Sequence, residues 1–442
     1  MTLDDEARAE LRELAAAHRL RAPRVVDGAP GPRIVLDGSL VLNLASNDYL
    51  GLAGDRRLSR AAAAALEETG GVGAGASRLI AGNHRAHAAL EAAVGAWMRC
   101  AGARVFGSGY AANSGVIAAL ARAGDAIFSD ELNHASIIDG CRLSRADVVV
   151  FPHGDLAALE AALASSAARA RRRRLVVSES LFSMDGDLAD VERLAALCRR
   201  HDAALVLDEA HAIGVLGPEG RGVAAAAGVV PDVVIGTFGK ALGTYGAFAA
   251  TTRAVADLLW NRARPFVFST GMPPAVAAAT AASIQIVRGA EGDDRRRAVA
   301  AHARRLRAGV PAAGGASESP IAPIRIDDDR RVMAISARLL EAGVFVQGIR
   351  PPTVPPGTAR LRVGLMATMA LPDLERAIAA IAGALADGAL ADGALADGAL
   401  ADGALADGAL RQEGAVRSAV RGAGNDAGAV DKSGAGDGGE RW

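Results

Sequence analysis

The stretch ALVLDEAH, residues 204–211, is a short apolar run that ends in carboxylates, and DVVIGTF at residues 232–238 is a second apolar run. Similar runs occur upstream as VVVF (148–151) and LVVSES (175–180), and alanine-rich helical patterns such as VERLAALCRRHD (191–202) follow them. Strands that are apolar on both sides and alternate with helices are typical of a parallel sheet with helices on both faces. The fold class is therefore α/β.

The pattern changes after about residue 285, where strands and helices become fewer and more polar. We expect an N-terminal helix and small β segment over residues 1–45, a large α/β domain over 46–285 and a smaller α+β domain over 286–385. In the smaller domain, residues 295–310, 331–343 and 372–385 are predicted helices, and 321–326 and 359–365 are predicted strands.

The sequence ADGAL occurs five times in a row from Ala386 to Leu410. A five-residue period carries the leucines around a helix axis without forming a stripe, so no packing face results. Each repeat also contains a glycine, and a Gly/Asp/Ser-rich end follows. We therefore predict a disordered tail over residues 386–442.

The composition is that of a globular protein, with 51% hydrophobic residues and a formal net charge of -1. This near-neutral charge gives no overall attraction to nucleic acid or to an anionic membrane. For the basic run ARARRRRL (168–175) we favour a solvated helix end over a nucleic-acid site. The three cysteines lack metal-ligand spacing, and the charged N-terminus lacks a signal-peptide core, so we expect no metal site and a cytoplasmic location.

Lysine is rare in this chain, because among 49 basic residues only Lys240 and Lys432 are lysines. Arginine stays protonated and cannot form an imine, whereas a desolvated lysine amine loses its proton readily. Lys240 follows the apolar run that ends at Phe238, and parallel sheets bind ligands beyond the carboxyl ends of their strands. A lone surface lysine is the alternative interpretation.

Three further segments place polar groups at comparable strand ends. Asp208 fits a helix cap, a magnesium ligand or the partner of a pyridinium nitrogen; magnesium in a nucleotide hydrolase would also need a GxxxxGK[ST] loop, which is absent. The glycine turn in RVFGSGYAANSGVIAAL (104–120) favours phosphate binding, although a dinucleotide fold begins similarly. For His134 by itself, a hydrogen-bonded structural role is favoured over a functional one.

The remaining polar motifs are individually uninformative. SLFSMDGD (180–187) and VFSTGMPP (267–274) fit ordinary turns, and strand arginines such as Arg360 and Arg362 in IRPPTVPPGTARLRVGL (349–365) are usually exposed to solvent.

Taken together, these segments resemble the α-oxoamine synthase family of pyridoxal phosphate enzymes, which have the fold-type I architecture of aspartate aminotransferase. The resemblance includes LNLASNDYLGLAGDRRL (42–58), GAGASRLIAGNHRAHAALE (73–91), GYAAN, NHAS, FSMDGD, LDEAHAIGVLGPEGRG and GTFGKALG, and covers about residues 15–385. It implies a transferase with a mainly parallel central sheet in its large domain.

The resemblance also implies roles for individual residues. Lys240 would form the Schiff base with pyridoxal 5'-phosphate, Asp208 would pair with the ring nitrogen, and His134 would stack on the ring. His211 and Ser183 would lie near the 3-hydroxyl, and Gly109, Tyr110 and Thr237 would hold the phosphate. Ser269 and Thr270 would reach the phosphate of a neighbouring subunit, and Arg362, Asn47, Thr353 and Arg19 would contact substrate.

The implied reaction is a decarboxylative condensation of a small amino acid with an acyl thioester. The motifs favour L-alanine and a pimeloyl thioester, carried on CoA or on acyl carrier protein, in a homodimer with shared sites. Family members that use glycine or serine with other acyl-CoAs remain alternatives, as does a noncatalytic pyridoxal phosphate-binding regulator or carrier.

Overall fold

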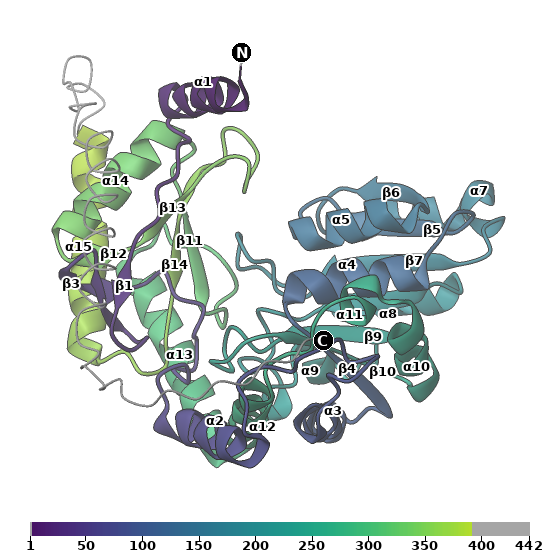
Figure 1. Cartoon of the computed structure of the whole chain (residues 1–442). Helices are drawn as coiled ribbons and strands as arrows, with labels where there is room; N and C mark the ends of the chain where they lie inside the picture. Colours follow the sequence, from purple (N-terminus) through teal and green to yellow (C-terminus); the bar gives the residue numbers. More distant parts are fainter. Residues whose placement is uncertain (1, 391–442) are drawn as a thin grey trace, which may run out of the picture. The chain divides into compact units, whose positions relative to one another are not determined.

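The computed structural model describes residues 2–390 (Figure 1). The chain divides into two units, Met1–Ala386 and Asp387–Trp442. Most of the predicted tail, residues 391–442, lies outside the described residues. The predicted boundary between a larger and a smaller domain near residue 285 stays a prediction.

The central element is a seven-stranded sheet in the order β4-β10-β9-β8-β7-β5-β6. Only β10 runs antiparallel to its neighbours, β4 and β9, so the predicted α/β class with a mainly parallel sheet is confirmed. The strands are β4 (Gly102–Phe106), β5 (Ala126–Asp130), β6 (Asp147–Phe151), β7 (Arg174–Glu179), β8 (Ala204–Asp208), β9 (Val233–Thr237) and β10 (Ala247–Thr251).

Helices cover both faces of this sheet, as the continuous apolar strands require. Along β7, Leu175 and Val177 belong to one hydrophobic cluster with residues of α4 (Gly109–Leu120), α5 (Ala135–Ser144) and α11 (Arg264–Val267). Val176 between them belongs to another cluster, with α6 (Leu156–Ala164) and α8 (Val191–Arg200). Alternate residues of one strand are therefore buried on opposite faces.

Two smaller sheets contain the remaining strands. A four-stranded sheet has the order β1-β2-β3-β12, and a three-stranded antiparallel sheet has the order β11-β14-β13. Their strands are β1 (Val26–Asp27), β2 (Arg33–Leu36), β3 (Ser39–Asn43), β11 (Ile321–Arg325), β12 (Val344–Phe345), β13 (Gln347–Ile349) and β14 (Arg360–Gly364). Strands β11 and β14 confirm the two predicted for the C-terminal part of the chain.

The other helices connect these sheets and pack around them (Figure 1). They are α1 (Leu3–Ala16), α2 (Arg56–Thr69), α3 (Arg85–Met98), α7 (Ser166–Arg169), the 3-10 helix η1 (Pro218–Gly220), α9 (Val223–Ala226), α10 (Arg253–Arg262), α12 (Pro274–Arg288), α13 (Ala290–Gly309), α14 (Asp329–Glu341) and α15 (Leu371–Leu390).

Helix α15 is longer than predicted, because it continues through the first ADGAL repeat to Leu390 instead of ending at residue 385. Ile378, Ile381 and Ala384 are buried against the core. The helix is thus anchored by residues that precede the repeats, and its hydrogen bonds continue into them.

The basic run at residues 168–175 differs from the solvated helix end that we predicted. Arg172 pairs with the buried Asp125 at 2.5 Å. Arg173 donates to the carbonyl of Leu120 at the end of α4, and Arg174 donates at 3.0 Å to the carbonyl of His201, just after α8. Guanidinium groups at helix C-termini satisfy carbonyls that have no partner within the helix. The run therefore joins neighbouring helices to the sheet.

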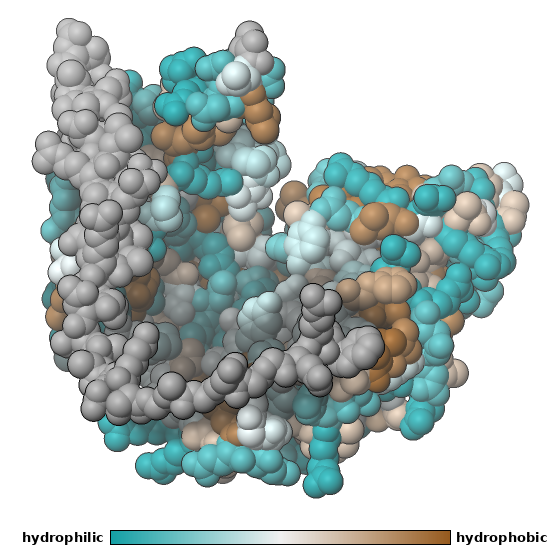
Figure 2. Space-filling view, in the orientation of Figure 1, coloured by the Kyte–Doolittle hydropathy of each residue, from teal (hydrophilic) through white to brown (hydrophobic). Residues whose placement is uncertain are grey.

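Helix α1 has no buried residue, although a capping box of Thr2 and Asp5 begins it. Its leucines Leu3, Leu11 and Leu14 are exposed. Figure 2 shows hydrophobic and hydrophilic residues side by side on the surface of this helix. Across residues 2–390, no helix combines the length and the apolar character that crossing a membrane requires.

Candidate active site

Five segments converge at the carboxyl-terminal edge of the parallel strands. Glu179 ends β7, Asp208 ends β8 and Thr237 ends β9, while α4 and α5 begin nearby. Parallel strands bring their carboxyl ends to one edge, which explains why residues far apart in sequence meet there. They surround a cavity of about 180 Å³, which is lined by Gly109, Tyr110, Asn113, His134, Ser136, Glu179, Asp208, Ala210, His211, Thr237 and Lys240.

Asp208 is held in place by two hydrogen bonds. Its Oδ2 accepts from Nδ2 of Asn113 at 2.6 Å, and its Oδ1 accepts from the backbone N–H of Ala210 at 2.8 Å. Asn113 Nδ2 also donates to Ser136 Oγ at 3.0 Å, so both of its hydrogens are used. The carboxylate is buried yet lines the cavity, which is the arrangement that recognition of a cationic ring N–H requires.

Lys240 takes part in a chain of hydrogen bonds that leads away from the cavity. Its Nζ lies 2.8 Å from Nε2 of His211, and Nδ1 of His211 lies 2.7 Å from Tyr49 Oη. Tyr49 Oη in turn donates to Asn47 Oδ1 at 3.0 Å. If Lys240 donates to Nε2, then Nδ1–H donates to Tyr49 Oη, and each contact from Nζ to Asn47 joins one donor to one acceptor.

Burial changes the protonation of this chain. It lowers the pKa of Lys240 to about 8, although the carboxylates of Asp208 and Glu179 oppose the shift. Burial also lowers the pKa of His211 well below its usual value, and the neighbouring Lys240 and Arg362 lower it further. His211 is therefore neutral. The pKa of Lys240 is close to physiological pH, so part of its amine is neutral and can act as a base.

Arg362 lies behind Tyr49 and is buried, unlike the solvent-exposed strand arginine that is usual. Its Nε donates to the carbonyl of Ser183 at 2.6 Å and its Nη2 donates to Tyr49 Oη at 3.2 Å. These bonds fix the guanidinium between the Lys240 chain and the turn that contains Ser183. Such a fixed fork suits a carboxylate ligand.

The predicted phosphate-binding residues lie at the start of α4 and the end of β9. Ser108 caps α4, since its side chain accepts from the N–H of Ala111, and this leaves the start of the helix at Gly109 and Tyr110 facing the cavity. Thr237 Oγ1 donates to the carbonyl of Gly246 at 3.1 Å. A helix N-terminus with its positive dipole end favours an anion.

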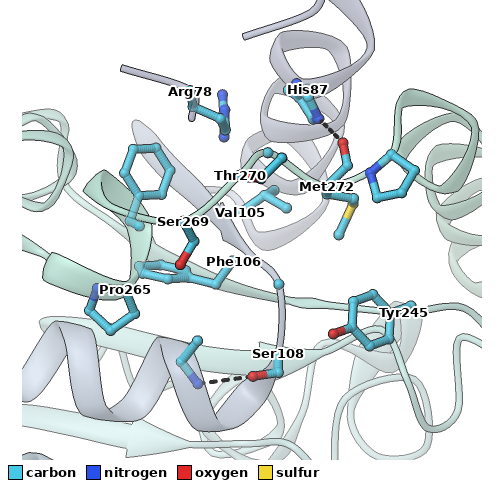
Figure 3. A pocket seen from close by; sticks show the side chains of 15 residues that line it. Arg78, His87, Val105, Phe106, Ser108, Tyr245, Pro265, Ser269, Thr270 and Met272 are labelled. Carbon is cyan, nitrogen blue, oxygen red and sulfur yellow. Dashed lines mark hydrogen bonds between the residues drawn. The ribbon is translucent and has the colours of Figure 1, made fainter. Parts of the chain in front are cut away.

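Ser269 and Thr270 do not line the Lys240 cavity. They line a second cavity of about 340 Å³ together with Arg78, Ser108 and Tyr245 (Figure 3). This cavity lies on the other side of the start of α4, because Gly107, Ser108 and Ala111 line it whereas Gly109, Tyr110 and Asn113 line the first.

None of the four predicted substrate residues lines the Lys240 cavity, although Asn47 and Arg362 are linked to it through Tyr49 and His211. Thr353 lines a third cavity and accepts from Arg21 Nη2 at 3.1 Å. Arg19 instead donates to Asp329 at 3.3 Å, at the start of α14. The structure thus brings Arg21, and not the predicted Arg19, to the loop that contains Thr353.

Sequence reasoning did not single out Glu179, Asn113 or Tyr49. Glu179 is buried and accepts from the backbone N–H of His134 at 2.7 Å, and burial raises its pKa. Its position at the end of an apolar run, like that of Asp208, was a usable signal. Asn113 and Tyr49 gave no local signal, because their partners are distant in sequence.

The cavity fits pyridoxal phosphate. Asn113 Oδ1 is buried and has no hydrogen-bond partner among the described residues, so a polar ligand is needed to satisfy it. An amine, a carboxylate and a helix N-terminus match the aldehyde, ring nitrogen and phosphate of that cofactor. Across residues 2–390, no cluster of acidic, histidine or cysteine side chains is suited to hold a metal ion.

The chain is similar to several known proteins. The family model for aminotransferases of class I and II matches residues 39–381. The 8-amino-7-oxononanoate synthase of Geotalea daltonii is 48% identical over 378 residues, which cover 84% of this chain and 96% of that protein. The serine palmitoyltransferase of Sphingomonas wittichii is 34% identical with a TM-score of 0.81 and covers 87% of this chain and 98% of its own.

A second serine palmitoyltransferase, from S. paucimobilis, was solved with a bound PLP–myriocin aldimine. It is 30% identical, has a TM-score of 0.80 and also covers 87% of this chain and 98% of its own.

Proposed function

Because the chain belongs to the class I and II aminotransferase family of pyridoxal phosphate enzymes, we propose that it condenses L-alanine with a pimeloyl thioester. The products would be 8-amino-7-oxononanoate, CO2 and the free thiol of the acyl carrier, as the name of its curated relatives indicates. One observation carries the proposal: Lys240 and Asp208 line one cavity, and the His211–Tyr49 pair links Lys240 to Arg362.

Different residues around the cavity would hold different parts of the cofactor. When bound, pyridoxal phosphate supplies an electron sink for the charge left on the amino-acid Cα atom. Lys240 would hold the aldehyde carbon, Asp208 the ring nitrogen and His134 the ring face. The remaining contacts would come from Gly109, Tyr110 and Thr237 at the phosphate and from His211 and Ser183 near the 3-hydroxyl.

Lys240 then acts as the base that moves the Cα proton. Its Nζ accepts the proton of bound alanine and later returns a proton to the product carbon. Burial favours this role, because a pKa of about 8 leaves a substantial fraction of the amine neutral near physiological pH. The neutral His211 accepts from Nζ and so orients its lone pair without adding positive charge.

Arg362 orients the amino acid by its carboxylate. Ser183 and Tyr49 hold the guanidinium on two sides, so the substrate meets a fixed fork rather than a mobile side chain. A fixed carboxylate fixes the Cα–H bond relative to Nζ of Lys240. The same guanidinium stays paired until CO2 leaves the condensed product.

We also propose a homodimer in which Ser269 and Thr270 complete the phosphate site of the partner. Both residues line the cavity in Figure 3 and not the Lys240 cavity. We further propose that the protein is cytoplasmic and that its pimeloyl group is carried by CoA or by acyl carrier protein.

The decisive experiment measures thiol release by the purified holoenzyme. L-alanine, glycine and L-serine are each paired with pimeloyl-CoA and acetyl-CoA, and Lys240→Ala is the control. Release with L-alanine and pimeloyl-CoA supports the proposal. Preference for glycine with acetyl-CoA would make the protein an acetyltransferase, and cofactor binding without any thiol release would make it a carrier.

A further inference from the structure

A fourth cavity lies at the opposite edge of the seven-stranded sheet from Lys240. It has a volume of about 400 Å³ and lies where β9 begins and β10 ends, with Val234 and Thr251 in its wall. Thr237, at the other end of β9, lines the Lys240 cavity. A strand rises by about 3.3 Å per residue, so the length of β9, about 13 Å, separates the two cavities. The proposed reaction makes no use of the fourth cavity.

The wall of the fourth cavity is mainly apolar. Met98, Ala225, Val229, Val230 and Pro231 contribute to it. The side chain of Val230 lies at the mouth, since Val230 is 94% exposed. Sites for small molecules have volumes of about 300–1,000 Å³ and are lined mainly by hydrophobic side chains, so size and lining suit a small ligand with an apolar part.

One side of the cavity is fixed from below by a buried carboxylate. Ala224 lines the cavity, and the backbone N–H groups of Val223 and Ala224 donate to Glu209 at 2.9 and 2.8 Å. Glu209 also accepts from Ser180 Oγ at 2.7 Å and is fully buried. This wall is therefore formed before any ligand binds, which lowers the entropic cost of binding.

Arg221 is the polar group of the wall that lacks a partner. Its Nε is buried without a hydrogen-bond acceptor, and its guanidinium forms no ion pair within residues 2–390. By contrast, Arg99 at the same cavity donates to Glu219 at 2.6 Å. A buried N–H without an acceptor is costly, and a carboxylate is the ligand that a guanidinium binds most strongly.

The other polar groups of the wall already have partners within the protein. The carboxylate of Asp232 accepts from the backbone N–H of Leu205 at 2.8 Å. Thr251 Oγ1 donates to the carbonyl of Asp232 at 2.6 Å, and the thiol of Cys100 donates to the carbonyl of Gly102 at 3.1 Å. Arg221 is thus the group that would select the polar end of a ligand.

We infer that the fourth cavity is a second binding site, which takes a medium-chain carboxylate. The hydrocarbon chain of the ligand lies along the apolar wall, and its carboxylate accepts from the guanidinium of Arg221. Both parts are needed, because the wall offers a chain no polar partner and the arginine offers a short anion little apolar contact. The inference goes beyond the proposed function and does not depend on it.

The test measures octanoate binding to the holoenzyme by ligand-observed NMR. Pimeloyl-CoA is present without L-alanine, so that octanoate does not enter the site of the acyl substrate. We expect a Kd of about 0.1–1 mM for octanoate. Octan-1-ol, which lacks the charge, and acetate, which lacks the chain, should each bind about tenfold or more weakly.

Two variants place this binding in the fourth cavity. Arg221→Met should weaken octanoate binding by about 10- to 100-fold and leave octan-1-ol unchanged. Val230→Glu changes a residue that is exposed at the mouth, so it does not disturb folding, and its negative charge should weaken octanoate binding by about fivefold. Arg60→Met is the matched control, because Arg60 is an exposed arginine of α2 that does not line the cavity, and it should bind octanoate like the wild type.

Two results would overturn the inference. One is equal octanoate affinity in the wild type and in Arg221→Met, with melting temperatures showing that both are folded. The other is binding by the wild type that shows no saturation below about 10 mM octanoate. Neither result depends on thiol release, so this inference and the proposed function can fail separately.

Discussion

The Nζ atom of Lys240 lies 2.8 Å from Nε2 of His211, a histidine that burial keeps neutral. A lysine that faced a protonated histidine would be repelled, whereas this lysine has an acceptor for one of its hydrogens. The pair thus holds the amine at the cavity wall while leaving it free to exchange protons. Arginine would stay protonated in this contact, whereas lysine can lose a proton, which fits the presence of lysine at position 240 in a chain whose sequence has only one other lysine, Lys432.

Replacement of Lys240 tests the role of its amine separately from its charge. We expect Lys240→Arg to lower kcat by about 10³-fold or more, as Lys240→Ala does, because a guanidinium neither adds to the aldehyde nor accepts the Cα proton. Steady-state thiol release measures the loss. Lys432→Arg is the control and should keep full activity; substantial turnover by Lys240→Arg contradicts the assignment.

The lowered pKa of Lys240 predicts a pH dependence for cofactor capture. Only the neutral amine adds to the aldehyde, so the capture rate of the cofactor-free protein should rise about tenfold per pH unit below pH 8. Above pH 8 the rate should level off. Stopped-flow absorbance after mixing with pyridoxal phosphate measures it, and a rise that continued to pH 10 would mean an unshifted lysine.

Asp208 should matter to chemistry more than to folding. Asp208→Asn removes the negative charge that would face the ring nitrogen, and we expect kcat to fall by about 100-fold or more. The melting temperature should fall only modestly, because asparagine still offers an oxygen to Asn113, although its NH2 group cannot accept from the backbone N–H of Ala210. Asp202→Asn is the control, as Asp202 is a highly exposed carboxylate. A loss of stability that matched the loss of activity would point to a structural role.

His153 gives a pH-dependent contribution to stability. Its Nδ1 lies 3.0 Å from Asp130 and its Nε2 lies 2.9 Å from Asp187, and these two carboxylates raise its pKa to about 10. The folded pKa is above the usual value of about 6.5, so the contribution is complete below pH 6.5 and is lost as pH rises toward 10.

His153→Asn should therefore lower the free energy of unfolding by about 2 kcal/mol at pH 6 and by less at pH 9. Urea denaturation at the two pH values measures the difference. An equal loss at both would show that the imidazole is not charged in the folded protein.

The buried residues Ile378, Ile381 and Ala384 of α15 precede the repeats. A chain that ends at Leu390 should keep the activity and melting temperature of the full chain, since the buried positions of the helix precede that point. A chain that ends at residue 380 loses Ile381 and Ala384 from the core, and its melting temperature should fall by several degrees. Scanning calorimetry compares the two, and a large loss at Leu390 would assign a role to the repeats.

Much of this site was predictable because strand ends are visible in sequence. Apolar runs that end in Asp208 or precede Lys240 mark one edge of a parallel sheet. The amine of Lys240 can form an imine, which arginine cannot, so its residue type indicates its role. By contrast, the contact between Tyr49 and His211 joins residues far apart in the chain, and no periodicity reports such a pair.

The wrong predictions, which concern the exposure of arginines, have a similar origin. Arg173 and Arg174 look like solvated charges in sequence, but carbonyls at helix ends supplied by distant segments accept their hydrogens. The burial of Arg362 likewise depends on the turn at Ser183, which a local pattern does not reveal. When the partner of a charged group is distant in sequence, the local sequence predicts that the group is exposed to solvent.

Every residue that lines the Lys240 cavity lies between Gly109 and Lys240, whereas Arg362 is synthesised much later. Arg362 belongs to β14 of the three-stranded sheet, whereas the strand ends at the cavity belong to the seven-stranded sheet. A substitution of Arg362 therefore changes no side chain that lines the cofactor cavity, so amino-acid binding and cofactor binding can be altered separately.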